Sequence, residues 1–213
     1  MLKNIIFDVG DVLLEYRWPE ALMALGLPEQ EARTLGRRMV HDPIWTMMDY
    51  GVMTPLEVAE KMRLVYPEQG DKIKWMMEHP ETLYVPRPEI WERVHKLKKQ
   101  GYRLFILSNY GKEMWEAHAA FQPFMQDMDG AVISYRMHLL KPNRDIYEYL
   151  LDTYALKPEE SLFFDDRRVN TDGARSAGIP SVTVRSREFL RETLDRILAE
   201  GEDGVPEEAA EGV

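Results

Sequence analysis

Short apolar runs alternate regularly with amphipathic segments over residues 87–199. Runs rich in β-branched and aromatic residues predict strands, and segments with apolar residues at helical spacing predict helices. Strands that alternate with helices are typical of a parallel sheet with helices on both faces. We therefore expect an α/β fold with a Rossmann-like sheet. The predicted strands are 3–9, 102–108, 130–135, 161–164 and 181–184, and the predicted helices include 89–100, 144–154 and 188–199.

Residues 16–86 follow a different pattern. Met, Trp, Leu and charged residues recur at helical spacing, and strand patterns are absent. In the stretch TPLEVAEKM, Thr54 is placed as a helix N-cap and Glu57 completes a capping box. We expect a core domain from residues 1–15 and 87–199, a helical cap domain from 16–86, and a disordered acidic tail at 200–213.

Charge and composition limit the partners. The 213-residue chain has a formal net charge of -10, which disfavours non-specific binding to nucleic acid. It has no apolar run long enough to span a membrane, and neither a basic start nor a signal-peptide pattern. It also has no cysteine, which fits a reducing compartment. We expect a cytoplasmic protein that binds a small molecule, with no nucleic-acid or membrane partner.

Polar side chains follow the ends of several predicted strands. In parallel sheets, ligands bind beyond the carboxyl ends of the strands, so these side chains are expected to meet at one rim. Each has an ordinary explanation alone, because acidic residues and Ser-Asn pairs are common in turns and at helix starts. Their joint placement therefore carries the prediction. The residues are Asp8, Ser108, Asn109, Lys141, Asp165 and Asp166.

These residue types suit phosphoryl transfer through an aspartyl phosphate. A carboxylate can attack phosphorus and divide one difficult step into two. Lys141 can supply positive charge, and Ser108 and Asn109 can supply hydrogen-bond donors, for a transition state that spreads negative charge over three oxygens. A pair of carboxylates such as Asp8 and Asp166 suits Mg²⁺, which offsets the repulsion between a carboxylate nucleophile and a phosphate.

The motifs FDVGDVL, ILSN, LLKP and LFFDDRRVNTDGARSAGI resemble, in order and spacing, the four motifs of the haloacid dehalogenase-like (HAD) superfamily. The helical insert resembles that superfamily's first type of cap. The double-Asp fourth motif most resembles the branch with bacterial sugar-phosphate phosphatases and the phosphatase domain of soluble epoxide hydrolase. The resemblance implies a Mg²⁺-dependent phosphatase that acts on a small phosphorylated metabolite, such as a sugar phosphate.

The resemblance also implies roles for individual residues. Asp8 would be the nucleophile, and Lys141 would pair with both Asp8 and the phosphate. The metal would be held by Asp8, the backbone carbonyl of Gly10 and Asp166, with Asp165 and Asn170 beside it, and the phosphate would be bound by Ser108, Asn109 and Lys141.

One departure from the family pattern concerns acid–base catalysis. Many phosphatases of the superfamily place a general-acid Asp two residues after the nucleophile, where this chain has Gly10. Such help is worth roughly 10²–10⁴-fold. Its loss leaves three alternatives. The chain could be a slow phosphatase, or a phosphatase in which water, Asp11 or a group of the substrate supplies the proton. It could also be a non-catalytic protein that binds a phosphate ligand. Dehalogenases also lack this Asp, but they lack the metal-binding fourth motif, which argues against dehalogenation here. A phosphomutase relies heavily on the missing acid.

The helical insert offers few residue-level predictions. Most of its aromatic and Met side chains are expected to form its own core, with Trp45 and Tyr50 the nearest to a substrate. We expect His41 to be structural or exposed, with substrate contact or proton donation as its alternative. Arg17, shortly after the first motif, could reach the substrate. Arg167, next to the fourth motif, is expected to be solvated or paired on a helix surface.

Overall fold

A computed structural model describes residues 1–209. Its central feature is a five-stranded parallel sheet in the order β5-β4-β1-β6-β7. The strands are β1 (Asn4–Phe7), β4 (Arg103–Ser108), β5 (Gly130–Ile133), β6 (Ser161–Asp165) and β7 (Ser181–Thr183). The predicted parallel α/β sheet is therefore confirmed, with the first strand of the chain at its centre.

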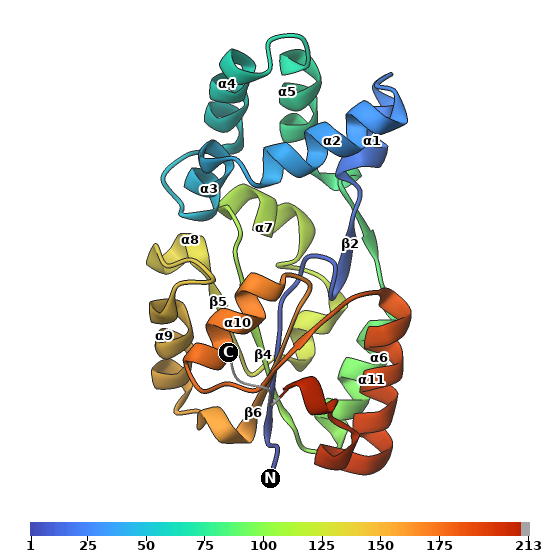
Figure 1. Cartoon of the computed structure of the whole chain (residues 1–213), viewed down its shortest axis with the longest axis vertical. Helices are drawn as coiled ribbons and strands as arrows, with labels where there is room; N and C mark the ends of the chain where they lie inside the picture. The colour runs from blue at the N-terminus through green and yellow to red at the C-terminus, as the bar shows by residue number, and fades with distance from the viewer. Residues whose placement is uncertain (210–213) are drawn as a thin grey trace.

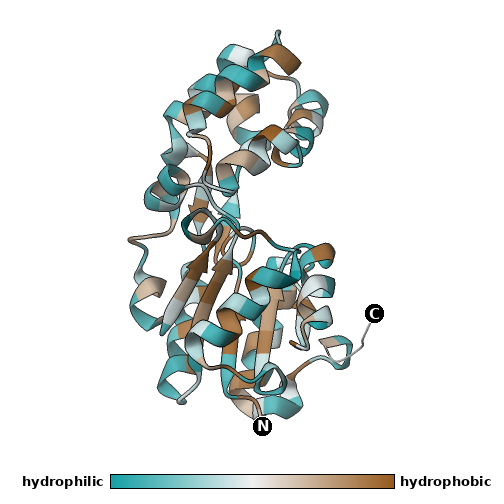
Figure 2. Cartoon of the chain, turned by 90° about the vertical axis from the view of Figure 1, so that its left-hand side faces the viewer, coloured by the Kyte–Doolittle hydropathy of each residue, from teal (hydrophilic) through white to brown (hydrophobic). Residues whose placement is uncertain are grey.

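Each face of the sheet is buried by its own pair of helices (Figure 1). Ile5 and Phe7 of β1 pack with α6 (Pro88–Lys99) and α11 (Arg187–Glu200). Ile6, which points to the opposite face, packs with α9 (Arg144–Tyr154) and α10 (Arg168–Ser176). Because both faces are covered, the central positions of the strands are apolar, and Figure 2 shows brown strands between amphipathic helices.

Five helices stack beyond the carboxyl ends of the strands and form a separate layer (Figure 1). They are α1 (Trp18–Ala24), α2 (Glu29–Val40), α3 (Pro43–Asp49), α4 (Pro55–Val65) and α5 (Gly70–Glu78). The predicted capping box is present at the start of α4: Glu57 N donates to Thr54 Oγ1 at 3.3 Å, and Thr54 N donates to Glu57 Oε2 at 2.8 Å. The helical character of this region agrees with its pattern, and its status as a cap domain stays a prediction.

Two short strands connect the helical layer to the sheet layer, and their presence corrects the expectation that this region has none. β2 (Leu14–Tyr16) pairs antiparallel with β3 (Tyr84–Pro86), so both crossings between the layers lie side by side. Each strand has three residues, which is too short for a two-residue alternation to be recognised in the sequence. Their pairing depends on a contact between segments far apart in the chain.

The remaining elements connect the main helices and strands. Two short helices lie near the sheet rim, α7 (Lys112–His118) and α8 (Ser134–Met137). Ser134 and Tyr135, predicted as the end of a strand, instead begin α8. Three 3₁₀ turns complete the connections: η1 (Pro80–Thr82), η2 (Pro123–Asp127) and η3 (Pro158–Glu160).

The acidic segment after α11 is ordered as far as the structure describes it, in contrast to the expected disordered tail. It forms the 3₁₀ turns η4 (Gly201–Gly204) and η5 (Glu207–Ala209). Ala209 is buried, and Arg175 Nη2 donates to Glu208 O at 3.3 Å. Its few apolar residues are thus enough to anchor it, and the rest of the predicted tail, residues 210–213, lies outside the described residues. Within residues 1–209, no helix combines the length and apolar character that crossing a bilayer requires.

Candidate active site

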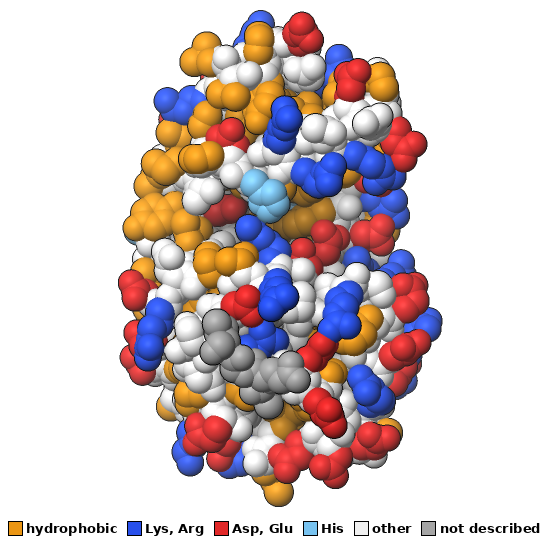
Figure 3. Space-filling view, in the orientation of Figure 1, with side chains coloured by type: hydrophobic (Ala, Val, Ile, Leu, Met, Phe, Trp, Pro, Cys, Tyr) orange, Lys and Arg blue, Asp and Glu red, His pale blue; other side chains and the backbone are white. Residues whose placement is uncertain are grey.

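The carboxyl ends of β1, β4 and β6 open into a cavity of about 510 Å³ between the sheet layer and the helical layer. Figure 3 shows a hollow between these two layers with Lys and Arg side chains around it. From the sheet side the cavity is lined by Asp8, Gly10, Ser108, Asn109, Lys141 and Asp166. The rim predicted from the strand ends therefore exists, and it faces the helical layer.

Asp8 is held by three hydrogen-bond donors from different parts of the chain. Its Oδ1 lies 2.5 Å from Ser108 Oγ, 3.0 Å from Lys141 Nζ and 2.7 Å from the amide nitrogen of Val9. The side chain is almost fully buried, with 7% of the residue exposed. All three contacts use the same oxygen, so within residues 1–209 Oδ2 accepts no hydrogen bond from the protein.

Lys141 is buried at the centre of the site. Its Nζ donates to Asp165 Oδ2 at 2.6 Å and to Leu107 O at 3.0 Å, in addition to its contact with Asp8. Burial disfavours the ammonium ion, but the carboxylates of Asp165 and Asp8 outweigh burial and raise the pKa of Lys141 above its usual value. The side chain is therefore charged throughout the neutral range.

Asn109 is tied to the backbone of Lys141 by a reciprocal pair of hydrogen bonds. Asn109 Nδ2 donates to Lys141 O at 3.0 Å, and Lys141 N donates to Asn109 Oδ1 at 2.9 Å. Lys141 does not directly follow β5 as the sequence suggested, because α8 intervenes. The amide of Asn109 thus sets the position of Lys141, while Asn109 also borders the cavity.

Three carboxylates gather at the sheet rim. Asp8, Asp165 and Asp166 each offer an oxygen, and these oxygens all lie within 4.8 Å of one another. Burial, together with the negative charge of the neighbouring carboxylates, raises the pKa of Asp166 above its usual value. The same two causes raise the pKa of Asp165, against the opposing effect of Lys141. A divalent cation would offset this repulsion, so the cluster fits a hard cation with oxygen ligands.

The two acids of the fourth motif have different environments. Asp165 is fully buried and accepts hydrogen bonds from Lys141 Nζ, from Asn170 Nδ2 at 3.0 and 3.1 Å, and from Arg167 N at 2.8 Å. Asp166 lines the cavity, and within residues 1–209 its carboxylate accepts no hydrogen bond. Asp166 is therefore the more available of the two for a metal ion, and Asn170 positions Asp165.

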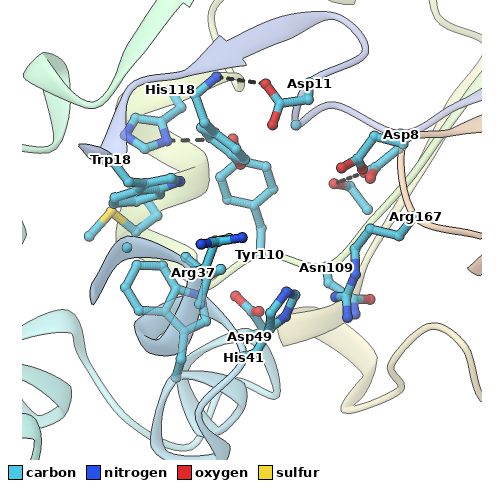
Figure 4. A pocket seen from close by; sticks show the side chains of 18 of the residues that line it. Asp8, Asp11, Trp18, Arg37, His41, Asp49, Asn109, Tyr110, His118 and Arg167 are labelled. Atoms are coloured by element: carbon cyan, nitrogen blue, oxygen red, sulfur yellow. Dashed lines mark hydrogen bonds between the residues drawn. The ribbon is translucent and has the colours of Figure 1, made fainter. Parts of the chain in front are cut away.

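Several cavity residues come from outside the sequence motifs. Figure 4 shows Arg37, His41, Asp49, Tyr110 and Arg167 around the cavity that Asp8 also lines. His41 was expected to be structural or exposed and Arg167 to be solvated or paired on a helix surface, and the other three residues were not considered for the site. Arg37, His41 and Asp49 belong to the helical layer, so their positions depend on how that layer packs over the sheet, which no local pattern encodes. Tyr110 and Arg167 directly follow motif residues at the ends of β4 and β6, and the strand-end pattern could have included them.

The two aromatic residues expected nearest to a substrate differ in placement. Trp45 lines the cavity and packs edge-on against Trp18, with ring centroids 4.9 Å apart. Tyr50 lies outside the cavity lining, and its backbone oxygen lies 2.7 Å from His138 Nδ1. Only the first of the two expectations therefore agrees with the structure.

The family model for haloacid dehalogenase-like hydrolase matches residues 2–178 of this chain. This chain belongs to the haloacid dehalogenase-like hydrolases. The match covers the sheet strands β1 to β6, the helical layer and all the carboxylates of the cluster. The resemblance drawn from the four sequence motifs is thus confirmed, and so is the assignment as a hydrolase.

The curated relatives have several different names. Bifunctional epoxide hydrolase 2 of Mus musculus is 29% identical over 47% of this chain and 19% of its own length. Pyrophosphatase PpaX of Bacillus mycoides is 28% identical over 53% of this chain and 54% of its own. (S)-2-haloacid dehalogenase 4A of Burkholderia cepacia is 28% identical over 86% of this chain and 83% of its own. The match thus spans about a fifth of the first of these relatives and about half of the second.

A solved structure supports the fold. A HAD family enzyme from Bacteroides thetaiotaomicron, crystallised with magnesium and inorganic phosphate, is 22% identical to this chain and has a TM-score of 0.66. The likeness covers 88% of this chain and 96% of that one. At this identity the likeness establishes a shared fold, which includes the sheet and the helices that flank it.

Proposed function

We propose that this chain is a Mg²⁺-dependent phosphatase that hydrolyses a small phosphorylated metabolite through an aspartyl phosphate on Asp8. The observation that carries the proposal is the arrangement around Asp8. Its carboxylate contacts a buried ammonium and a hydroxyl, and it also belongs to a cluster of three carboxylates that suits a divalent cation. A nucleophile, phosphate-binding donors and metal ligands thus meet at the floor of one cavity.

In the proposed reaction, the Asp8 carboxylate attacks phosphorus while the hydroxyl of Ser108 and the ammonium of Lys141 donate hydrogen bonds to the phosphate oxygens. Asp165 keeps Lys141 charged and in place, and Asn109 fixes the backbone of Lys141. Mg²⁺, held by Asp8, Asp166 and the carbonyl of Gly10, would offset the repulsion between carboxylate and phosphate. The helical layer over the cavity would exclude water from the reacting atoms.

The comparisons support phosphate chemistry at a coarse level. One relative is named a pyrophosphatase, which refers to phosphate chemistry. The structural neighbour from Bacteroides thetaiotaomicron was crystallised with magnesium and inorganic phosphate. The sugar-phosphate class of substrate rests on the resemblance of the fourth motif alone. The cavity volume of about 510 Å³ is sufficient for a metabolite of that size.

The test is release of inorganic phosphate from a panel of phosphorylated metabolites, with Mg²⁺ and with a chelator. We expect at least one substrate, dependence on Mg²⁺, and loss of measurable turnover in Asp8→Asn. Asp152→Asn makes the same change of charge on an exposed residue of α9 and serves as the control. Turnover unchanged in Asp8→Asn, or tight phosphate binding without turnover on the whole panel, would contradict the proposal.

Dehalogenation of a 2-haloacid is the second candidate, because the dehalogenase 4A match covers most of the chain and Gly10 lacks a carboxyl group. The carboxylate cluster favours the phosphatase, since attack on carbon needs no divalent cation. Halide release from an (S)-2-haloacid, insensitive to a chelator and abolished in Asp8→Asn, would support this second candidate.

A further inference from the structure

The first proposed step leaves an alcoholate that must receive a proton, and the structure explains why position 10 cannot supply it. A Cβ atom on Gly10 would lie 2.3 Å from Cε2 of Tyr16, so the ring of Tyr16 fills the space that an acidic side chain there would need. The ring of Tyr16 packs against that of Tyr110, with centroids 6.2 Å apart, and burial raises the pKa of Tyr16 well above its usual value. A phenol in this state is poorly matched to proton exchange near neutral pH.

Asp11, the other acid of the first motif, stabilises a turn through contacts with Tyr16 and Arg87. It has a left-handed backbone with φ of 52°, and its Oδ1 accepts a hydrogen bond from Tyr16 N at 3.1 Å. Arg87 Nη2 lies 3.8 Å from the same oxygen. Burial raises the pKa of Asp11, but the amide of Tyr16 and the guanidinium of Arg87 both favour its ionised form. Asp11 borders the cavity as a turn-stabilising carboxylate.

We propose that Asp49, the last residue of α3, donates the proton to the leaving group and later accepts a proton from the attacking water. This inference rests on the phosphatase function proposed above. Asp49 lines the cavity from the helical layer, opposite the floor formed by Asp8 (Figure 4). A leaving group projects away from the nucleophile, so its oxygen points toward this side of the cavity.

The carboxyl end of α3 is fixed against the sheet layer. Ser134 Oγ donates to the backbone oxygen of Asp49 at 2.5 Å. A Cβ atom on Gly111 would lie 2.4 Å from Cγ of Met48, so the loop before α7 and the end of α3 are in close contact. Asp49 is therefore held at a defined place over the floor, as a proton donor must be.

The charge environment of Asp49 suits both halves of the reaction. Burial raises its pKa to about 7, and the negative charge of Asp8 acts in the same direction. Arg167 and Lys141, together with the backbone amide of Gly111, oppose this rise. Within residues 1–209 Asp49 forms no salt bridge, so no paired cation holds it in the ionised state. A carboxyl group that titrates near the working pH can donate a proton and accept one in turn.

The steps balance in atoms and charge. An oxygen of Asp8 forms a bond to phosphorus as the bond from phosphorus to the ester oxygen breaks, and the ester oxygen takes the proton of the Asp49 carboxyl. Water then attacks the phosphorus of the aspartyl phosphate and gives one proton to the Asp49 carboxylate. The bond from Asp8 to phosphorus breaks, which releases phosphate and restores both side chains.

The test compares two esters with similar rings and different leaving groups, phenyl phosphate and 2,4-dinitrophenyl phosphate, in the Mg²⁺-loaded protein. A good leaving group needs no proton, so Asp49→Asn should lower kcat/KM for phenyl phosphate by roughly 10²–10⁴-fold and that for the dinitrophenyl ester by less than about tenfold. For phenyl phosphate, wild-type kcat/KM should fall as the pH rises through about 7, and this fall should be absent in Asp49→Asn.

Other variants and outcomes separate this inference from the proposed function. Asp49→Ser repeats the test with a smaller side chain, and melting temperatures verify that both variants fold. An equal loss on both esters, or a selective loss in Asp11→Asn in place of Asp49→Asn, would overturn the role of Asp49 while leaving the phosphatase intact. Failure of the wild-type protein to release phosphate from both esters and from the whole metabolite panel would overturn both proposals.

Discussion

At the scale of single residues, the glycine two places after the nucleophile is explained by packing. Gly10 has no positive φ, so its backbone does not require glycine, and the ring of Tyr16 is what excludes a side chain. Gly10→Ala should destabilise the protein by about 1–3 kcal/mol, as overpacking of a filled site does. The free energy of unfolding in urea measures this effect.

Two variants test the cause of that destabilisation. In Gly10→Ala with Tyr16→Leu, the added methyl group should cost less than it does beside Tyr16, so the two substitutions should be less than additive. Gly36→Ala is the matched control, because its nearest atoms would lie 3.7 Å away and alanine favours the helix. If Gly10→Ala destabilises the Tyr16→Leu protein as much as it destabilises the wild-type protein, this explanation is refuted.

The residues at the rim of the sheet could be predicted from the sequence because each one follows a strand, and each strand is recognisable by its run of apolar residues. Asp8, Ser108 and the acidic pair at the end of β6, Asp165 and Asp166, were placed in this way, and the structure brings them together. Asp49 and Tyr16 carry no such local signal. Their positions depend on the angle at which the helical layer meets the sheet, which arises from long-range packing.

At the scale of elements, buried His118 links α7 to the turn that follows the helical layer. Its Nε2 lies 2.8 Å from Pro80 O, and only 1% of the residue is exposed. Burial lowers its pKa from 6.5 to about 4. Between these pH values His118 binds a proton in the unfolded chain but not in the folded chain. Its contribution to the free energy of unfolding is therefore complete above about pH 6.5 and is lost as the pH falls toward 4.

The expected contribution of His118 is as much as about 3 kcal/mol of unfolding free energy, lost between pH 7 and pH 4. In His118→Gln the stability at pH 7 should be lower, but its decline on acidification should be shallower by a similar amount. His95→Gln is the control, because His95 is exposed and lies 2.9 Å from Asp127. Urea unfolding at several pH values decides the matter, and parallel declines in wild type and His118→Gln would disprove the assignment.

Helices and strands were predicted well where the sequence pattern within a single segment is enough to identify them. The helix at 144–154 was placed at its observed bounds, and the capping box of α4 is present. β2 and β3 were missed because each is stabilised only by the other strand. The turns η4 and η5 were missed because acidic composition concealed the packing of Ala209.

At the scale of the whole molecule, the carboxylate cluster predicts that Mg²⁺ stabilises the fold. The cluster exists only when β1 and β6 lie side by side, so a cation that binds it favours the folded state. Millimolar Mg²⁺ should raise the melting temperature of the wild-type protein, and Asp166→Asn should remove this rise. Asp152→Asn, a control of the same charge change, should retain it. An equal rise in all three proteins would indicate non-specific screening and contradict a metal site at the cluster.

The central claim is that Asp8 becomes covalently phosphorylated. Its most direct test is rapid acid quenching of the Mg²⁺-loaded protein during turnover of phenyl phosphate, followed by mass spectrometry of the peptide that contains residues 4–17. We expect this peptide to carry one phosphoryl group on Asp8 in the wild-type protein and none in Asp8→Asn. Turnover without any phosphorylated residue, or with the group on another side chain, would contradict the claim.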